Sequence, residues 1–283
     1  MNKVNEKIAK YIFLIAACTS VIAVAVICIF LFAGGLPAIG GIGAADFLFG
    51  TKWKPGNNMY GILPMILGSI CVTAGAIAVG VPIGIFTAVY MVYFCPKPVY
   101  KVMKPLTELM AGIPSVVYGF FGLVVMVPLI REVFDCKGNV MLTAILLLGI
   151  MILPTIIGVS EAAIRAVPGK YYQGALALGA TKERSIFFAA LPAAKSGILA
   201  AVVLGIGRAI GETMAVIMVA GNQTMMPKGI FKGVRTMTAN IVLEMGYAAD
   251  LHREALIATG VVLFTFILII NLVFAALKES GER

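Results

Sequence analysis

The sequence predicts an all-α integral membrane protein with six transmembrane helices. Of its 283 residues, 61% are hydrophobic and only 12% are charged, whereas charged residues make up about a quarter of a typical soluble domain. The apolar residues gather in runs of 22 to 33 residues, and only one run contains charges. This composition excludes a water-soluble enzyme built around a single core and an intrinsically disordered chain.

Six apolar runs predict the transmembrane helices, because roughly 20 helical residues cross a hydrocarbon core about 30 Å thick. The first run follows three lysines, as the apolar region of a secretory signal does, but its 23 residues exceed the roughly 7–15 of such a region. We therefore expect an uncleaved first helix and loop within residues 1–60, a transmembrane domain of five helices at 61–277 and a short tail at 278–283. The predicted spans are 11–33, 62–94, 109–130, 138–160, 196–221 and 255–277.

Glycine and proline are frequent in the second and third predicted spans, for example at Gly68, Pro82, Pro114 and Gly119. In lipid, small residues let helices approach closely, and interior prolines free backbone groups that neighbours or cavity water must satisfy. Two interpretations remain open. These residues serve tight helix packing, or they let the helices bend around a substrate path.

The lysines and arginines predict that both termini lie in the cytoplasm. The two termini and the second and fourth connections hold 13 of these residues, whereas the other three connections hold 8. Positively charged connections tend to stay on the cytoplasmic side. The sequence therefore predicts a multi-pass protein of the cytoplasmic membrane, and its net charge of +9 is interpreted as a topology signal rather than a nucleic-acid-binding patch.

The cysteines and the single histidine indicate neither a metal site nor a disulfide framework. Three of the five cysteines lie inside apolar runs, no Cys-x-x-Cys pair is present, and His252 is isolated in the sequence. Structural metal sites and disulfide frameworks need several such residues at short, regular spacings. We expect no metal, no redox chemistry and no cofactor bound by this chain.

Two outer segments, Gly34–Tyr60 and Gly221–Arg253, are expected to be exposed loops because they are rich in turn-forming residues. The first contains Trp53, the only tryptophan. Both segments are too short to be separate domains, and either is a candidate contact for an extracytoplasmic partner.

The inner connection at 161–196 has the character of a helix-turn-helix. It combines alternating charges with a helical apolar pattern that includes Ala175 and Leu178, and its turn signals gather around Pro168 and Gly179. Its 36 residues are far more than two antiparallel helices need for a connection. The segment is either an amphipathic pair that lies on the bilayer or a docking platform for a cytoplasmic protein.

Arg208 and Glu212 are the charged residues in the fifth predicted span. An ionised side chain in the middle of a bilayer costs from about 3 to more than about 10 kcal/mol, so such residues face protein or water. Their spacing of four predicts that they share one helix face, and Gly207 and Gly211 would let a neighbouring helix approach closely. Two hypotheses remain: a buried structural ion pair, or an Arg208 guanidinium that contacts an anion in transit and is positioned by Glu212.

The chain has no recognisable nucleotide site of its own. Residues 174–181 have the glycine spacing of a P-loop, but Ala180 stands where the phosphate-binding lysine is needed. Gly205, Gly207 and Gly211 are misspaced for a dinucleotide fold and lie in a predicted membrane span. If ATP drives transport, another polypeptide must hydrolyse it.

The inner connection resembles the cytoplasmic EAA loop of the permeases of ATP-binding-cassette (ABC) importers. The segment Gln173–Gly179 keeps the spacing of that loop to its glycine and to a later Leu-Pro, although Gln173 and Gly174 replace the usual Glu and Ala, and Ala189 replaces the usual Ile. By this resemblance, the residues that contact the ATPase are Gln173, Gly174, Ala175, Gly179, Leu191 and Pro192.

Two further segments, 111–122 and 207–216, narrow the resemblance to the PstC family of phosphate-importer permeases over about residues 60–276. The resemblance implies a type I importer (MetI-like) permease fold with a cytoplasmic coupling helix. It implies a heterodimer with a PstA-type permease, a dimer of PstB-type ATPases that holds ATP and Mg, and an extracytoplasmic phosphate-binding protein. The chain would be a transport subunit for inorganic phosphate rather than an enzyme, with Arg208, Glu212 and Ser115 along the substrate pathway.

Several alternatives stay open beside the phosphate permease. The chemistry of a guanidinium suits sulfate or molybdate equally, and a PstA-type subunit is a related possibility. A membrane-embedded enzyme is disfavoured, because His252 and the aspartates are scattered rather than clustered at one membrane face. A non-transporting scaffold or sensor would tolerate replacement of Arg208, whereas a permease would not.

Overall fold

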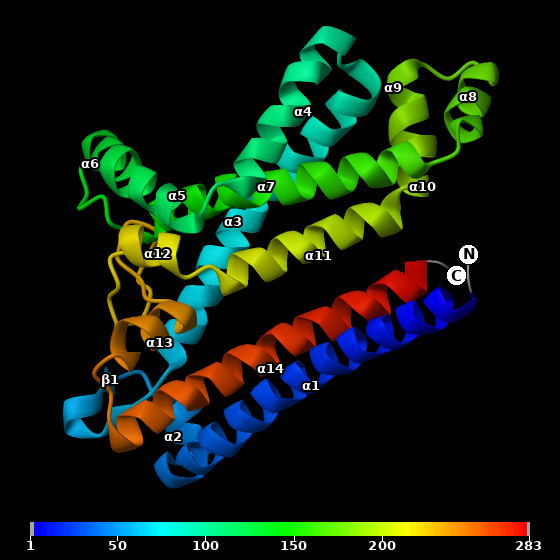
Figure 1. Ribbon diagram of the computed structural model, residues 1–283. Helices are drawn as coiled ribbons and strands as arrows, with labels where there is room; N and C mark the ends of the chain where they lie inside the picture. Colours follow the sequence, from blue (N-terminus) through cyan, green and yellow to red (C-terminus); the bar gives the residue numbers. More distant parts are fainter. Residues whose placement is uncertain (1–2, 282–283) are drawn as a thin grey trace.

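The structure is a computed structural model that describes residues 3–281, with side chains for residues 8–276, and it is almost entirely helical (Figure 1). Two short strands form an antiparallel hairpin around a 3₁₀ turn at Pro55–Asn57: β1 (Trp53–Lys54) and β2 (Met59–Tyr60). Three helices continue through π-helical turns, at Tyr90–Phe94, Gly122–Met126 and Ile186–Ala190. The helices are α1 (Lys3–Ile42), α2 (Ala44–Phe49), α3 (Leu63–Val89), α4 (Lys97–Gly112), α5 (Ser115–Phe121), α6 (Val127–Phe134), α7 (Met141–Ala166), α8 (Gly169–Ala177), α9 (Lys182–Ser185), α10 (Leu191–Ala193), α11 (Lys195–Gly211), α12 (Met214–Val219), α13 (Met237–Met245) and α14 (Asp250–Gly281).

Five helices among the described residues are long and apolar enough to span a membrane, and a bent helix pair provides a sixth span. The bent pair joins Lys182–Ala193 to Lys195–Gly211 at an angle of 72°. The predicted all-α membrane protein with six spans is therefore confirmed, although several boundaries move. The five unbroken spans are Ile8–Ile42, Leu63–Phe94, Ser115–Phe134, Met141–Ala166 and Asp250–Ala276.

The first helix is longer than the sequence predicted. It continues through Gly35 and Pro37 to Ile42, so the expectation of an exposed loop over the whole of Gly34–Tyr60 is wrong for its first part. A Cβ atom at Gly35 would lie 2.6 Å from Val261 Cγ2 of α14. The glycine lets α1 and α14 pack in close contact, and this packing outweighs the low helix propensity of the segment.

The third predicted span, 109–130, contains a break. Helix α4 ends at Gly112, and the next span begins at Ser115. Proline disfavours helical backbone in the residue before it, and Ile113 before Pro114 has φ −68° and ψ 127°. The break leaves α4 as a separate amphipathic helix that has no buried side chain and that the sequence analysis did not identify.

The fifth predicted span, 196–221, is also broken. Helix α11 ends at Gly211, Glu212 has extended backbone with φ −68° and ψ 128°, and α12 begins at Met214. The Oε1 atom of Glu212 accepts a hydrogen bond of 3.1 Å from the backbone N–H of Ala215. This cap satisfies a free donor in the first turn of α12, so it favours a new helix start over a continuous helix.

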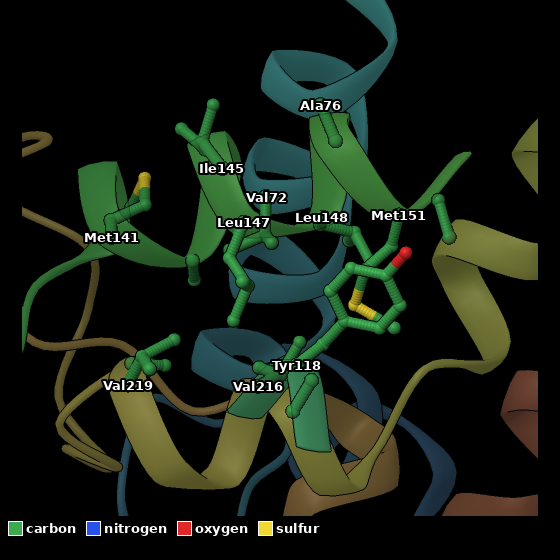
Figure 2. Packing of buried hydrophobic residues seen from close by; sticks show 14 of the residues in the cluster. Val72, Ala76, Tyr118, Met141, Ile145, Leu147, Leu148, Met151, Val216 and Val219 are labelled. Atoms are coloured by element: carbon green, nitrogen blue, oxygen red, sulfur yellow. The ribbon is translucent and has the colours of Figure 1, made fainter. Parts of the chain in front are cut away.

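The core of the molecule lies between α3 and α7, which pack along each other (Figures 1 and 2). A Cβ atom added to any of three glycines on α3 would lie 2.6–2.8 Å from an isoleucine of α7. These contacts support the tight-packing interpretation for the second span. The glycine–isoleucine pairs are Gly75 with Ile145, Gly80 with Ile152 and Gly84 with Ile156, and Figure 2 shows the adjacent buried side chains, among them Val72, Ala76, Leu147, Leu148, Met151 and Tyr118.

Replacing Gly80 with Ala is expected to destabilise the protein by about 1–3 kcal/mol. The added methyl group would lie 2.8 Å from Ile152 Cδ1 and 2.9 Å from the backbone oxygen of Gly149. The matched control is Gly158→Ala on α7, where no atom lies within 4 Å of the added carbon. Thermal unfolding in detergent measures both variants, and equal unfolding temperatures would contradict the proposed packing.

The connections predicted for the two sides of the membrane lie toward opposite ends of the molecule. Figure 1 shows the beginning of α1, the end of α14, and helices α8 and α9 toward one end, with β1, α2 and α13 toward the other. This arrangement agrees with the predicted grouping of the termini with the connection 161–196. Of the lysines and arginines behind that prediction, the side chains of Lys3, Lys7, Lys278 and Arg283 lie outside the described residues.

Candidate functional site

Arg208 lies on α11, one turn before the break, and its side chain is half-buried. Its Nη1 atom donates a hydrogen bond of 3.2 Å to Thr155 Oγ1 of α7. The guanidinium therefore contacts a neighbouring helix, as expected for a charge at membrane depth. A guanidinium has five N–H donors, and within the described residues the bond to Thr155 is its one hydrogen bond.

The structure does not support the hypothesis of a structural ion pair between Arg208 and Glu212. No ion pair joins them among the side chains at 8–276. Glu212 instead caps α12, and its backbone oxygen accepts a hydrogen bond of 3.1 Å from Thr238 Oγ1. The spacing of four implies a shared face only in a continuous helix, and the break at Glu212 removes that condition. The hypothesis of a structural ion pair between these two residues falls with it.

Ser115 is the first residue of α5 and is half-buried. A Cβ atom at Gly119 would lie 2.9 Å from Ala215 Cα, and one at Gly122 would lie 2.8 Å from Val219 Cγ1. From the first contact to the second, the residue numbers rise in both segments, from Gly119 to Gly122 and from Ala215 to Val219. The α5 and α12 segments therefore run parallel and in close contact. The start of α5 at Ser115 and the break before α12 therefore lie at the same level.

The break between α4 and α5 is held by a side chain. The Tyr118 hydroxyl donates a hydrogen bond of 2.9 Å to the backbone oxygen of Met110, near the end of α4. The same oxygen accepts the backbone N–H of Ile113 at 3.4 Å, so the hydroxyl adds a second hydrogen bond at this end of α4. Two helix breaks, each with a side chain that bonds across it or caps it, thus lie at one level, and Arg208 is one turn before the second of them.

The inner connection forms the predicted helix-turn-helix. Gln173, Gly174 and Ala175 lie on α8, and Gly179 ends it with a left-handed φ of +84°. The surface of this segment is apolar as well as exposed, since Leu178 has 91% of its area and Phe188 77% of its area accessible. An exposed apolar surface of this kind is typical of a contact with another protein or with lipid.

Leu191 and Pro192 lie at the other end of this connection, at the start of α10. Leu191 is half-buried and packs against a small apolar cluster, whereas Pro192 is exposed. Tyr172 of α8 packs on the same cluster, and its ring centroid lies 5.3 Å from that of Tyr93 at the end of α3. The cluster thus joins α8 to the inner ends of α3 and α7, and its buried members are Ala88, Val89, Ile164, Ile186 and Ala194.

Glu161 is a buried carboxylate near the end of α7 that the sequence did not reveal. Glu161 is 2% exposed, and its carboxylate accepts hydrogen bonds from Tyr100 and Lys104 of α4 and from Arg165 one turn later on α7. The signal that could have identified it is its position directly after an uncharged run, beside a segment rich in cations.

A second missed carboxylate, Glu244 on α13, lies toward the end of the molecule opposite the two termini (Figure 1). It accepts hydrogen bonds from Trp53 Nε1 at 2.8 Å, from Arg235, and from His252 Nε2 at 2.9 Å. His252 is therefore not isolated, contrary to the sequence analysis. Glu244 is the one charged residue between Arg235 and Asp250, and this isolation in the sequence could have marked it as a buried carboxylate. The cluster joins the β1–β2 hairpin to α13 and α14, so much of the two predicted outer loops is folded.

A basic cavity of about 750 Å³ lies between the α6–α7 connection and the segment that follows α12. It is lined by Lys137, Lys228 and Lys232 together with Asp135. None of the predicted pathway residues lines it. The lysines give this surface a positive potential that attracts anionic groups.

Known proteins resemble this chain over most of its length. Residues 80–280 match the family described as binding-protein-dependent transport system inner membrane component. The chain is 38% identical over 271 residues to the probable ABC transporter permease protein YqgH of Bacillus subtilis, which covers 91% of this chain and 88% of that protein. It is 32% identical over 265 residues to the phosphate transport system permease protein PstC of Mesorhizobium japonicum, covering 86% of this chain and 81% of that protein.

Among solved structures, the fold resembles a chain of the MetNI methionine ABC transporter in an inward-facing conformation. The TM-score is 0.65 at 18% identity, and the match covers 82% of this chain and all of that chain (100%). At this identity the likeness concerns the fold alone. It confirms the predicted MetI-like fold.

Proposed function

The chain belongs to the family of inner membrane components of binding-protein-dependent transport systems, and from this premise we propose that it imports inorganic phosphate across the cytoplasmic membrane by alternating access. It is a PstC-like permease of multi-pass helical structure. Beyond membership of the family, the proposal assigns the substrate, the direction of transport and the coupling of transport to ATP hydrolysis on a separate subunit.

The observation that carries the proposal is the half-buried Arg208 one turn before the second helix break, where its one hydrogen bond within the described residues goes to Thr155. Phosphate is largely a dianion near neutral pH and needs several donors. Arg208 supplies a charge and a planar fork that fits two phosphate oxygens. Ser115 supplies a hydroxyl at the N-terminal end of the span Ser115–Phe134, where free N–H groups favour an anion.

The partner permease completes this site in our proposal. Arg208 is the one cationic residue between Ser196 and Gly221, so this chain offers a single positive charge to an anion at that depth. A PstA-type subunit in a heterodimer would provide the remaining donors. Glu212 stays near the pathway as the cap of α12, and it limits how tightly the anion is held. The similarity to a PstC permease of a phosphate transport system supports phosphate over other oxyanions.

The exposed surface of α8 is proposed to dock on a dimer of PstB-type ATPases, with both termini on the same cytoplasmic side. ATP and Mg bind to those subunits and not to this chain. Closure of the ATPase dimer displaces α8, and the helix breaks let the spans alternate between two arrangements that bind phosphate differently. An extracytoplasmic phosphate-binding protein delivers the anion at the outer end.

The experiment that tests this proposal is ATP-dependent uptake of labelled phosphate into vesicles that contain this chain with its candidate partner subunits and binding protein. We expect uptake that excess sulfate does not reduce. Uptake that sulfate competes away would assign the chain to another oxyanion. No uptake from a demonstrably assembled complex would overturn the importer assignment.

A further inference from the structure

The Glu161 carboxylate fastens α4 to the rest of the molecule. Tyr100 donates a hydrogen bond of 2.6 Å to its Oε1 atom, and Lys104 Nζ donates one of 3.0 Å to Oε2. Arg165 Nε donates a third, of 2.9 Å, to Oε1 from the next turn of α7, and its guanidinium stacks over the Tyr100 ring at 5.0 Å from the centroid. Two cations and a phenol thus converge on one buried carboxylate.

This polar contact attaches α4 to the end of α7. Within the described side chains, no residue of α4 is buried, so the helix has little apolar contact to hold it in place. A buried carboxylate, by contrast, keeps its donors strongly, because losing them leaves a charge without partners. Its hydrogen bond to Glu161 raises the pKa of Lys104, so Lys104 is charged at neutral pH, and its part of the contact is lost as the pH rises through that raised value.

The contact lies between the two functional regions. On one side, α7 ends at Ala166, α8 begins at Gly169, and the apolar cluster around Tyr172 joins them. On the other side, α4 leads within three residues to the break at Ile113–Pro114 and to Ser115 at the candidate anion site.

We propose that Glu161 is the positioning residue that transmits movement of the coupling helix α8 to α4, and through α4 to the helix break beside the anion site. The inference rests on the proposed function in one respect, since it takes α8 to be the element that the ATPase moves. Glu161 is buried and belongs to α7 rather than to α8 or the candidate anion site. It acts by making α4 follow the end of α7.

A direct test measures whether α4 moves when ATP binds. Spin labels are placed at Lys101 of α4 and at Lys54 of the outer hairpin, both exposed, in a chain without its five cysteines and assembled with its ATPase subunits. We expect ATP to shift the distance between the labels, and Glu161→Gln to abolish that shift. No shift in the parent chain, or an undiminished shift in Glu161→Gln, overturns the proposal. This readout does not depend on which anion is transported.

The functional test compares phosphate imported with ATP hydrolysed in the same vesicles. We expect Glu161→Gln to lower that ratio at least tenfold while binding-protein-stimulated hydrolysis stays within twofold of the parent. The control Lys101→Gln changes an exposed lysine of the same helix and should keep the ratio. Tyr100→Phe removes one hydrogen-bond donor to Glu161 and keeps the ring, so we expect it to lower the ratio as well. This variant provides the test if Glu161→Gln fails to assemble. A normal ratio in Tyr100→Phe together with a normal label shift counts against the proposal. If the parent imports no phosphate but the label shift behaves as expected, the assigned substrate fails and the role of Glu161 stands.

Discussion

Replacing Arg208 with Gln is expected to abolish ATP-dependent phosphate uptake while the protein stays folded and assembled. Gln keeps a donor for Thr155 but removes the charge that binds the anion. Losing a charged interaction of about 3 kcal/mol corresponds to a roughly 100-fold fall in uptake. Because Arg208 forms no ion pair with Glu212 in the described structure, the substitution leaves no carboxylate without a partner, and the fold should survive.

The measurement for Arg208→Gln combines labelled-phosphate uptake with the amount of complex recovered from the membrane. Lys195→Gln is the matched control, because Lys195 is an exposed cation at the start of the same helix, and we expect it to retain uptake. Arg208→Lys keeps the charge but not the planar fork, so an intermediate rate is expected. Disappearance of the Arg208→Gln protein from the membrane would return Arg208 to a structural role.

Replacing Gly179 with Val is expected to lower phosphate uptake about tenfold by uncoupling it from ATP hydrolysis. Gly179 has φ +84°, a conformation that costs a β-branched residue about 1–3 kcal/mol. No atom lies within 4 Å of an added Cβ atom, so the effect is backbone strain rather than a clash. The strain would distort the end of α8, where Gly179 and Ala180 donate hydrogen bonds to backbone oxygens of the helix.

The measurement for Gly179→Val follows uptake, ATP hydrolysis and phosphate capture by the binding protein in one preparation. Capture should be unchanged. Gly169→Ala is the matched control, since Gly169 is the first residue of α8 and the nearest atom to an added Cβ atom is Gln173 Nε2 at 4.0 Å, and we expect it to transport normally. Unchanged uptake in Gly179→Val would count against α8 as the docking helix.

The helix break at Glu212 illustrates where inference from the sequence stopped. An apolar run predicts a helix of the right length, because burial in lipid depends on local composition. The same pattern cannot reveal that Glu212 leaves the helix to cap α12, because that choice depends on contacts with α5 and with Thr238. Pro114 was the better local signal, since the restriction on the residue before proline acts wherever proline occurs.

The sequence by itself determined the membrane class, the six spans, the helix-turn-helix at 161–196 and the positions of the motif residues, because hydrophobicity, length and motif spacing are properties of neighbouring residues. The tertiary structure alone decided which polar groups meet. Glu161 meets Tyr100 across 61 residues of chain, and Glu244 meets Trp53 across 191. Such partners are chosen by helix packing, since a buried carboxylate is stable only where the fold brings donors to it.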